Sequence, residues 1–339
     1  MKIAILNAYQ ENVSRGAETF VQELSKRLSQ KNTVEVISGD SYHESNWPVI
    51  WRVFLDPKGL QILFFTLKKL SYLWKNKFDV VIPINGGWQP ALLRILTWLY
   101  GGKMIIAGQS GIGWDDKNNL WCFPDYFVAL SSYAKTWAKK INPFVATIYI
   151  PNGVDIKNFS PEGSKMKLKL KKPIIITVGA LTQTKRINLT IEAVSRLRNV
   201  SLLVVGDGEL RKDLEHLGRS LLSDRFAILK LPFEEMPKAY RCGNLFTLVS
   251  EPFYSFEIAI IEALSTNLPV VVNNDPLRKE IVGDAGIFVN PEDSESYAKA
   301  LERALRTDWE NKPRKQAEKF SWDKVALQYE VLFKSLILK

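Results

Sequence analysis

The sequence predicts an α/β protein made of two parallel-sheet domains, and three observations support this. The chain has 339 residues, which is enough for two domains of ordinary size. Short β-rich runs alternate with amphipathic helical patterns, as expected for parallel sheets with crossover helices. The alternation then begins again near residue 173, after a stretch rich in Pro, Gly and Asn.

Each half contains its own series of expected elements. The first half has strand-like runs at residues 2–8, 33–39, 78–84, 103–108 and 125–130, with a helix at 18–29. The second half has strand-like runs at 173–181, 200–208, 227–232, 244–250 and 269–274, with helices at 188–198, 209–218 and 257–264. We therefore expect an N-terminal domain at 1–155, a C-terminal domain at 156–320, and a final helix at 321–339 that packs back on the first domain.

Composition restricts the class of protein. With 46% hydrophobic and 24% charged residues, the chain is of the globular type, and no apolar stretch approaches the roughly 20 residues needed to cross a bilayer. The opening residues do not have the pattern of a secretory signal, so we expect a cytoplasmic protein, with peripheral contact at the inner face of the membrane left open. The net charge of +10 suits a phosphate-bearing ligand or an anionic surface, and we expect no nucleic acid partner.

Three expected helix starts could bind an anion without a metal, because a helix N-terminus carries partial positive charge. The first lies just after Gly16, where the backbone can approach a ligand. The second follows Lys185 and Arg186, and the third starts near Glu257. The chain has two histidines and no D-x-D pair, so neither a His-based triad nor a metal-bound diphosphate is predicted.

Other residues give weaker signals. Gly206 and Gly208 form a G-x-G turn without the third glycine of a dinucleotide fingerprint, which argues against an oxidoreductase. Asp115 and Asp116, beside Trp114, are expected in an extended segment where one could face an acceptor. A helical stripe of apolar side chains is interpreted as facing the core, ahead of a membrane surface; it consists of Leu60, Leu63, Leu67, Leu70 and Trp74.

Several segments, in order, resemble glycosyltransferase family 4, the retaining enzymes of the GT-B fold. They are RGAETFVQELSKRL, VALSSYAKTW, IPNGVDIKNFSP, VGALTQTKRINLTIEAV, LLVVGDGELRKDLE, AGIFVNPEDSESYAKALERAL and FSWDKVALQYEVLF. The resemblance covers nearly the whole chain. It implies two Rossmann-like doubly wound domains facing each other across a cleft, and transfer of a sugar from a nucleotide diphosphate sugar to a glycan or lipid-linked acceptor. It implies no cofactor beyond this co-substrate, and no metal.

The resemblance also implies roles for individual residues. Lys185 would contact the diphosphate, Glu262 the ribose, and the backbone of 255–257 the sugar and phosphates, with Gln109 as the candidate for the family's loop histidine. The implied catalytic set is Lys185, Gln109 and Glu257; the donor set is Gly16, Gly179, Lys185, Arg186, Gly206, Ser255, Phe256, Glu257 and Glu262; the acceptor set is Trp114, Asp115 and Asp116.

Three positions depart from the family pattern. Tyr254 stands where the family has a sugar-facing glutamate, Glu257 where it usually has glycine, and Ala180 where it usually has arginine, whose charge Arg186 could supply. We interpret the departures as an altered choice of donor. The alternative is a catalytically impaired homologue that binds a nucleotide or glycan as the partner of another transferase.

Overall fold

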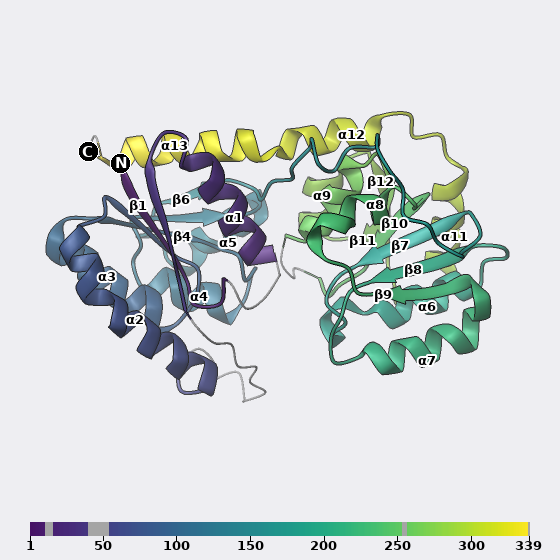
Figure 1. The fold of residues 1–339 in the computed structure, drawn as a ribbon, viewed down its shortest axis with the longest axis horizontal. Coiled ribbons are helices and arrows are strands. Elements are labelled where there is room, and N and C mark those ends of the chain that lie inside the picture. Colours follow the sequence, from purple (N-terminus) through teal and green to yellow (C-terminus); the bar gives the residue numbers. More distant parts are fainter. Residues whose placement is uncertain (11–15, 40–53, 253–255, 338–339) are drawn as a thin grey trace. The chain divides into compact units, whose positions relative to one another are not determined.

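The computed structural model describes residues 1–10, 16–39, 54–252 and 256–337, and these form two compact units. The first consists of Met1–Asn152 with Trp322–Lys339, and the second of Gly153–Ser321. Each unit contains one six-stranded sheet with helices on both faces (Figure 1). The described sheets are parallel throughout, which confirms the predicted fold class of two doubly wound domains.

The first unit has the strand order β2-β1-β3-β4-β5-β6. Its elements are β1 (Lys2–Asn7), α1 (Gly16–Leu28), β2 (Thr33–Ser38), α2 (Pro57–Asn76), β3 (Val80–Pro83), α3 (Trp88–Tyr100), β4 (Lys103–Ala107), α4 (Trp114–Trp121), β5 (Tyr126–Ala129), α5 (Ser132–Ile141), β6 (Thr147–Tyr149) and α13 (Trp322–Ile337). Successive residues of β1 point to opposite faces, so Ile3 and Ile5 pack with α1 and α13 while Ala4 and Leu6 pack with α2 and α3. Both faces are therefore covered, which explains the continuous apolar strands.

The C-terminal helix α13 belongs to the first unit. Its residues Trp322 and Tyr329 pack against the ring of Phe20 on α1, with ring centroids 6.1 Å and 6.0 Å apart. Arg27 on α1 also donates to the carboxylate of Asp323 at 2.7 Å. Buried aromatic side chains, and not surface contacts alone, therefore hold the C-terminal helix on the first unit.

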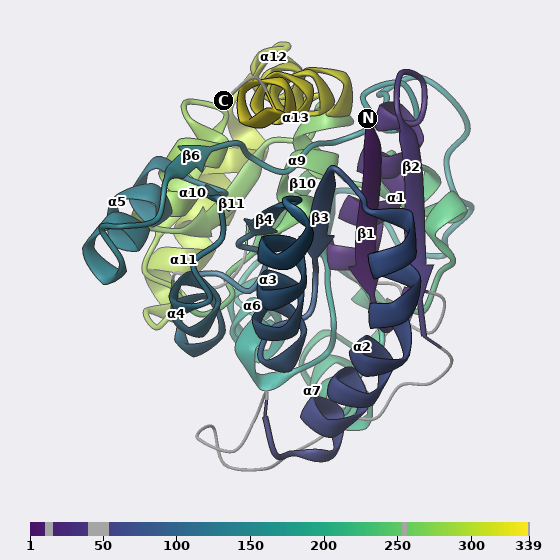
Figure 2. The ribbon, with the colours of Figure 1, turned by 90° about the vertical axis from the view of Figure 1, so that its left-hand side faces the viewer.

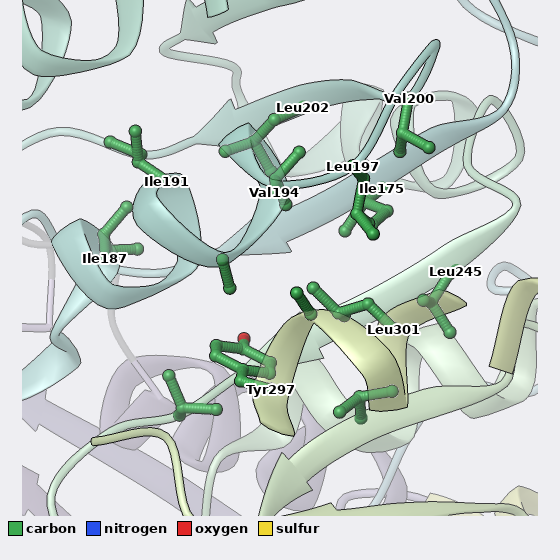
Figure 3. Packing of buried hydrophobic residues seen from close by; sticks show 14 of the residues in the cluster. Ile175, Ile187, Ile191, Val194, Leu197, Val200, Leu202, Leu245, Tyr297 and Leu301 are labelled. Carbon is green, nitrogen blue, oxygen red and sulfur yellow. The ribbon is translucent and has the colours of Figure 1, made fainter. Parts of the chain in front are cut away.

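The second unit has the strand order β12-β11-β10-β7-β8-β9. Its elements are β7 (Ile174–Val178), a 3-10 turn (Gln183–Lys185), α6 (Ile187–Ser195), β8 (Ser201–Val205), α7 (Arg211–Leu222), β9 (Phe226–Leu229), α8 (Met236–Tyr240), β10 (Leu245–Leu248), α9 (Ile258–Ser265), β11 (Val270–Asn273), α10 (Pro276–Val282), β12 (Gly286–Val289), α11 (Ser294–Arg306) and α12 (Lys312–Ala317). Figure 3 shows residues of the core of this unit, where Ile187, Ile191 and Val194 of α6 and Tyr297 and Leu301 of α11 belong to one buried cluster. The Tyr297 hydroxyl lies 2.5 Å from Thr247 Oγ1, so this buried polar atom has a partner.

The predicted core stripe on α2 is wrong for Leu60, Leu67 and Trp74, which are exposed, whereas Leu70 does pack against the core. The structure buries Ile62, Phe65 and Leu73, whereas Leu67 and Trp74 of the predicted stripe are each 45% exposed. Both sets repeat at helical spacing, so periodicity alone could not choose between the two faces. The remaining members of the predicted stripe are exposed Leu60 and half-buried Leu63 and Leu70.

No helix in the described ranges is long and apolar enough to cross a membrane.

Truncating the aromatic contact of α13 should destabilise the first unit. Phe333 is fully buried beside Tyr329, and replacing a buried Phe by Ala typically costs about 3 to 5 kcal/mol. Phe333→Ala should therefore lower the urea midpoint measured by circular dichroism. Val331→Ala is the matched control, because Val331 is 61% exposed on the same helix. Equal midpoints for the two variants would contradict this packing.

Candidate functional site

The sheet of the second unit changes direction between β7 and β10. The chain runs outward from β7 through β8 to β9, then returns to the other side of β7 to form β10, β11 and β12. In doubly wound sheets, ligands bind beyond the carboxyl ends of the strands at such a switch point. The loops that leave β7 and β10 here are the two that contain Lys185 and Glu257.

These two residues form a buried ion pair. Lys185 Nζ donates to Glu257 Oε2 at 2.5 Å, and their side chains are only 11% and 5% exposed. Arg278, in the first turn of α10, brings a second cation to within 3.6 Å of Glu257 Oε1. One carboxylate thus lies between two buried cations, and the described residues donate no hydrogen bond to its Oε1 atom.

Arg278 is fully buried and held by further contacts. Its guanidinium donates to Ser250 Oγ at 2.7 Å, and Asp275, the N-cap residue of α10, lies 3.6 Å away. The sequence analysis missed this arginine. A signal was present, because Asp275-Pro276 after a buried strand predicts a helix start and places Arg278 in its first turn.

Two helices begin at this edge without a side-chain cap. The N-cap residues of α6 and α9 are Arg186 and Glu257, and neither side chain bonds to the first-turn N–H groups of its helix. Both have left-handed backbones, with φ of 48° and 60°. This conformation costs a residue other than glycine roughly 1 to 3 kcal/mol, and it is found where surrounding contacts enforce it. Both helix N-termini keep N–H groups that suit an anion.

The Arg186 side chain is hydrogen-bonded to the loop after β10. Its Nε donates to the Val249 carbonyl at 2.8 Å, one terminal nitrogen donates to the Ser250 carbonyl at 2.9 Å, and the other pairs with Glu292 at 2.6 Å. Arg186 therefore positions this loop. The second cation beside the Lys185–Glu257 pair is Arg278.

Two of the three glycines of the donor set, Gly179 and Gly206, lie against each other, and Gly179 also lies against Lys185. A Cβ on Gly206 would lie 1.9 Å from the Gly179 carbonyl oxygen, so this backbone contact requires glycine at 206. The aliphatic chain of Lys185 lies 3.6 Å from the Cβ position of Gly179. The close contact thus supports the loop that presents Lys185.

Glu262 lies inside α9 and is 7% exposed. Its Oε2 accepts a hydrogen bond from the Tyr240 hydroxyl at 2.7 Å. Burial raises the pKa of Glu262 to about 7, although the hydrogen bond from Tyr240 acts in the opposite direction. The same burial, together with the nearby carboxylate, raises the pKa of Tyr240 well above its ordinary value. Glu262 is therefore a buried carboxylate with a tyrosine as its partner.

The predicted residues of the first unit fall into separate groups. Gly16 is the first residue of α1. Gln109 and Asn152 exchange side-chain amide hydrogen bonds of 3.1 Å and 2.9 Å, which ties the IPNG segment to the end of β4.

The extended conformation expected for Asp115 and Asp116 is wrong, because both residues lie in the first turn of α4. They follow Trp114, which is half-exposed, in the sequence. Asp116 is buried and accepts from Asn119 at 3.1 Å. Burial raises its pKa to about 8, although hydrogen bonds from Asn119 and the Gly111 backbone lower it.

The other two residues of the donor set are Phe256 and Ser255. Phe256 is buried, with its ring 6.0 Å from that of Phe320 in the same unit. Ser255, like Tyr254, lies outside the described residues. Among the residues that the structure describes, no three His, Cys, Asp or Glu side chains gather where they could hold a metal ion.

The fold is that of known GT-B glycosyltransferases. HepE of Anabaena, solved in complex with UDP, aligns with a TM-score of 0.76 and 18% identity over 99% of this chain and 100% of that one. Residues 172–307 match the family model of glycosyl transferases group 1. The second unit is thus similar to group 1 glycosyltransferases, and the predicted resemblance is confirmed at this level; the narrower assignment to family 4 stays a prediction.

Relatives extend the similarity to the rest of the chain. The O-antigen biosynthesis glycosyltransferase WbnH of Escherichia coli is 25% identical over 95% of this chain and 96% of its own length. The UDP-Gal:α-D-GlcNAc-diphosphoundecaprenol α-1,3-galactosyltransferase of Escherichia coli is 30% identical over 45% of this chain and 44% of its own length. With three other curated relatives, the match spans only 36%, 24% and 50% of their lengths.

The burial of Glu262 predicts a stability that falls as pH rises. Between its ordinary pKa of 4.5 and the raised value of about 7, the unfolded chain loses this proton while the native chain keeps it, so unfolding becomes easier. The difference of 7 − 4.5 corresponds to about 3 kcal/mol above pH 7. Glu262→Gln carries no charge and should escape this loss, so its stability relative to wild type should rise between pH 5 and pH 8.

Urea denaturation at several pH values measures this difference. Glu302→Gln is the control, because it removes a carboxylate that is 51% exposed on α11. A wild-type-minus-Glu262→Gln difference that stays constant with pH would show that Glu262 is ionised in the native protein.

Proposed function

We propose that this protein is a metal-independent, retaining glycosyltransferase that transfers a sugar from a nucleotide diphosphate sugar to a glycan or lipid-linked acceptor. The observation that carries the proposal is the paired cations at the switch point of the second unit, which is similar to group 1 glycosyltransferases. The names of the relatives support the class of reaction: WbnH acts in O-antigen biosynthesis, and the galactosyltransferase uses a diphosphoundecaprenol acceptor.

The donor's diphosphate binds at Lys185 and at the N-termini of α6 and α9. Cleavage of the bond between the sugar and the phosphate leaves negative charge on the departing diphosphate, and fixed cations and N–H groups stabilise that charge as it develops. Buried in a protein interior, these groups interact more strongly than they would in water. No metal is needed for this step, because the cation is supplied by the protein.

Glu257 competes with the donor's diphosphate for Lys185. Its carboxylate is the anion bound to Lys185, so the phosphate must displace it. Arg278 lies 3.6 Å from the other carboxylate oxygen and can keep Glu257 partnered after Lys185 is released. This matters because a buried charge left without a partner typically costs about 3 to 5 kcal/mol.

The remaining contacts orient the donor and the acceptor. Glu262 accepts hydrogen bonds from the ribose hydroxyls, which provide the polar partners that a buried carboxylate needs. The leaving phosphate acts as the base for the acceptor hydroxyl, so the reaction proceeds on one face with retention. The acceptor binds the first unit, with Gln109 and the α4 segment from Trp114 to Asp116 as candidates.

Binding of nucleoside diphosphates and their sugar conjugates tests the proposal. At about 100 times its dissociation constant, a ligand adds roughly 2.7 kcal/mol of stability, which appears as a rise in melting temperature. We expect such a rise with one nucleotide sugar, unchanged by a chelator. No rise with any nucleotide would instead favour the catalytically impaired partner, and a rise with nicotinamide dinucleotides would favour an oxidoreductase.

Lys185→Ala should remove most of this binding. A hydrogen bond to a charged group contributes about 1.5 to 3 kcal/mol, so the dissociation constant should increase by about 10- to 100-fold. The matched control is Lys299→Ala, which removes the same charge from an exposed position on α11. Calorimetric titration measures each variant, and unchanged affinity and transfer in Lys185→Ala would refute the assignment of the site.

A further inference from the structure

The outer faces of α2 and α3 expose a large apolar surface. Its principal side chains are 45% to 69% exposed: Phe64, Leu67, Trp74, Ile95, Trp98 and Leu99. We call these six residues, with the basic side chains between them, the α2/α3 surface. Scattered apolar side chains are normal on a protein, but a contiguous patch of this kind marks an interaction site.

The six side chains face away from the sheet. On α2, Phe64, Leu67 and Trp74 follow one another at helical spacing, opposite to Ile62 and Phe65 in the core. On α3, Ile95, Trp98 and Leu99 lie opposite Leu93 and Leu96 in the same core.

The two helices form one continuous surface. Figure 2 shows α2 and α3 beside each other in front of the sheet of the first unit. The ring of Trp74 on α2 contacts that of Tyr100 at the end of α3, with centroids 6.4 Å apart. Beyond α3, Trp98 also lines a hollow with Phe123 and with Phe144, which is 84% exposed.

The charges on α2 and α3 themselves are of one sign, and Asp125, which pairs with Arg94, follows α3 in the hollow beside Trp98. Helix α2 has 20 residues and α3 has 13, and neither helix contains an Asp or Glu residue. Their basic residues are Lys58, Lys68, Lys69, Lys75 and Arg94, and Lys77 caps the end of α2. Lys68 and Lys75 are exposed on the same side of α2 as Phe64.

We propose that the α2/α3 surface docks on an anionic lipid bilayer. Interfacial helices combine apolar and aromatic side chains that enter the headgroup region with lysines that reach anionic lipids. A protein partner fits less well, because lysine is depleted at protein interfaces. The inner faces of α2 and α3 are packed on the sheet through Ile62, Phe65 and Leu93, so the helices would lie along the bilayer surface with their outer faces toward it.

The benefit of docking on a bilayer follows from the proposed function, on which this step of the inference rests. A lipid-linked acceptor is held at the membrane, so a docked first unit finds it by motion along the surface rather than through solution. Docking itself needs neither donor nor turnover, so it is measured independently of transfer.

Sedimentation with vesicles tests the proposal. We expect the full-length protein to bind equimolar phosphatidylcholine and phosphatidylglycerol vesicles, to bind pure phosphatidylcholine weakly, and to be released as salt rises. Phe64→Ser with Trp98→Ser should weaken binding, and so should Lys68→Glu with Lys75→Glu. About 1 kcal/mol per lysine near an anionic surface makes the loss for the lysine pair at least about tenfold.

Helix α13 supplies matched controls on the opposite face of the same sheet. Leu327 and Val331 are 56% and 61% exposed there, and Lys324 and Lys334 are exposed lysines. Leu327→Ser with Val331→Ser, and Lys324→Glu with Lys334→Glu, should bind anionic vesicles like wild type. All variants should keep the nucleotide-induced rise in melting temperature, which separates loss of docking from loss of the donor site.

Two results would overturn the proposal. One is equal vesicle binding by the α2 variants and the α13 variants. The other is the absence of vesicle binding by the wild-type protein. If the wild-type protein then self-associated and the double variant Phe64→Ser with Trp98→Ser did not, the surface would belong to an interface with a second copy.

Discussion

The ion pair between Lys185 and Glu257 is the interaction on which the account of the second unit depends. A buried lysine and a buried carboxylate stabilise each other only if both remain partnered, and Arg278 makes this possible from the far side of the carboxylate. The sheet order brings the three together, because β7, β10 and β11 are neighbours and their carboxyl ends share one edge. The left-handed backbones of Arg186 and Glu257 are held at this same edge. Strain, buried charge and uncapped helix starts therefore coincide at the position where doubly wound sheets bind ligands.

Much of this arrangement could be predicted from the sequence, because its signals are local. Gly16, Lys185 and Glu257 were each expected at or next to a helix start, and the helices begin at 16, 187 and 258. Contacts between distant segments could not be predicted. Arg278 joins the site only through the pairing of β10 with β11, and the turn of Arg186 toward Val249 depends on the loop after β10.

The wrong predictions also concern features that depend on contacts between segments distant in the sequence. On α2 both the exposed and the buried residues repeat at helical spacing, so the choice of face required knowledge of which set meets the sheet. Asp115 and Asp116 were expected in an extended segment, whereas the helix begins at once after Gly113. The exposed stripe on α2 was nevertheless informative, since its combination of apolar side chains and lysines is also the pattern of a membrane surface.

The most direct test of the central claim is a crystal structure of the protein with its nucleoside diphosphate. Phosphate oxygens should lie within hydrogen-bond distance of Lys185 Nζ, the Glu257 carboxylate should have left Lys185, and the contact between Glu257 and Arg278 should be retained. A nucleotide bound while the Lys185–Glu257 distance stays at 2.5 Å would contradict the central claim.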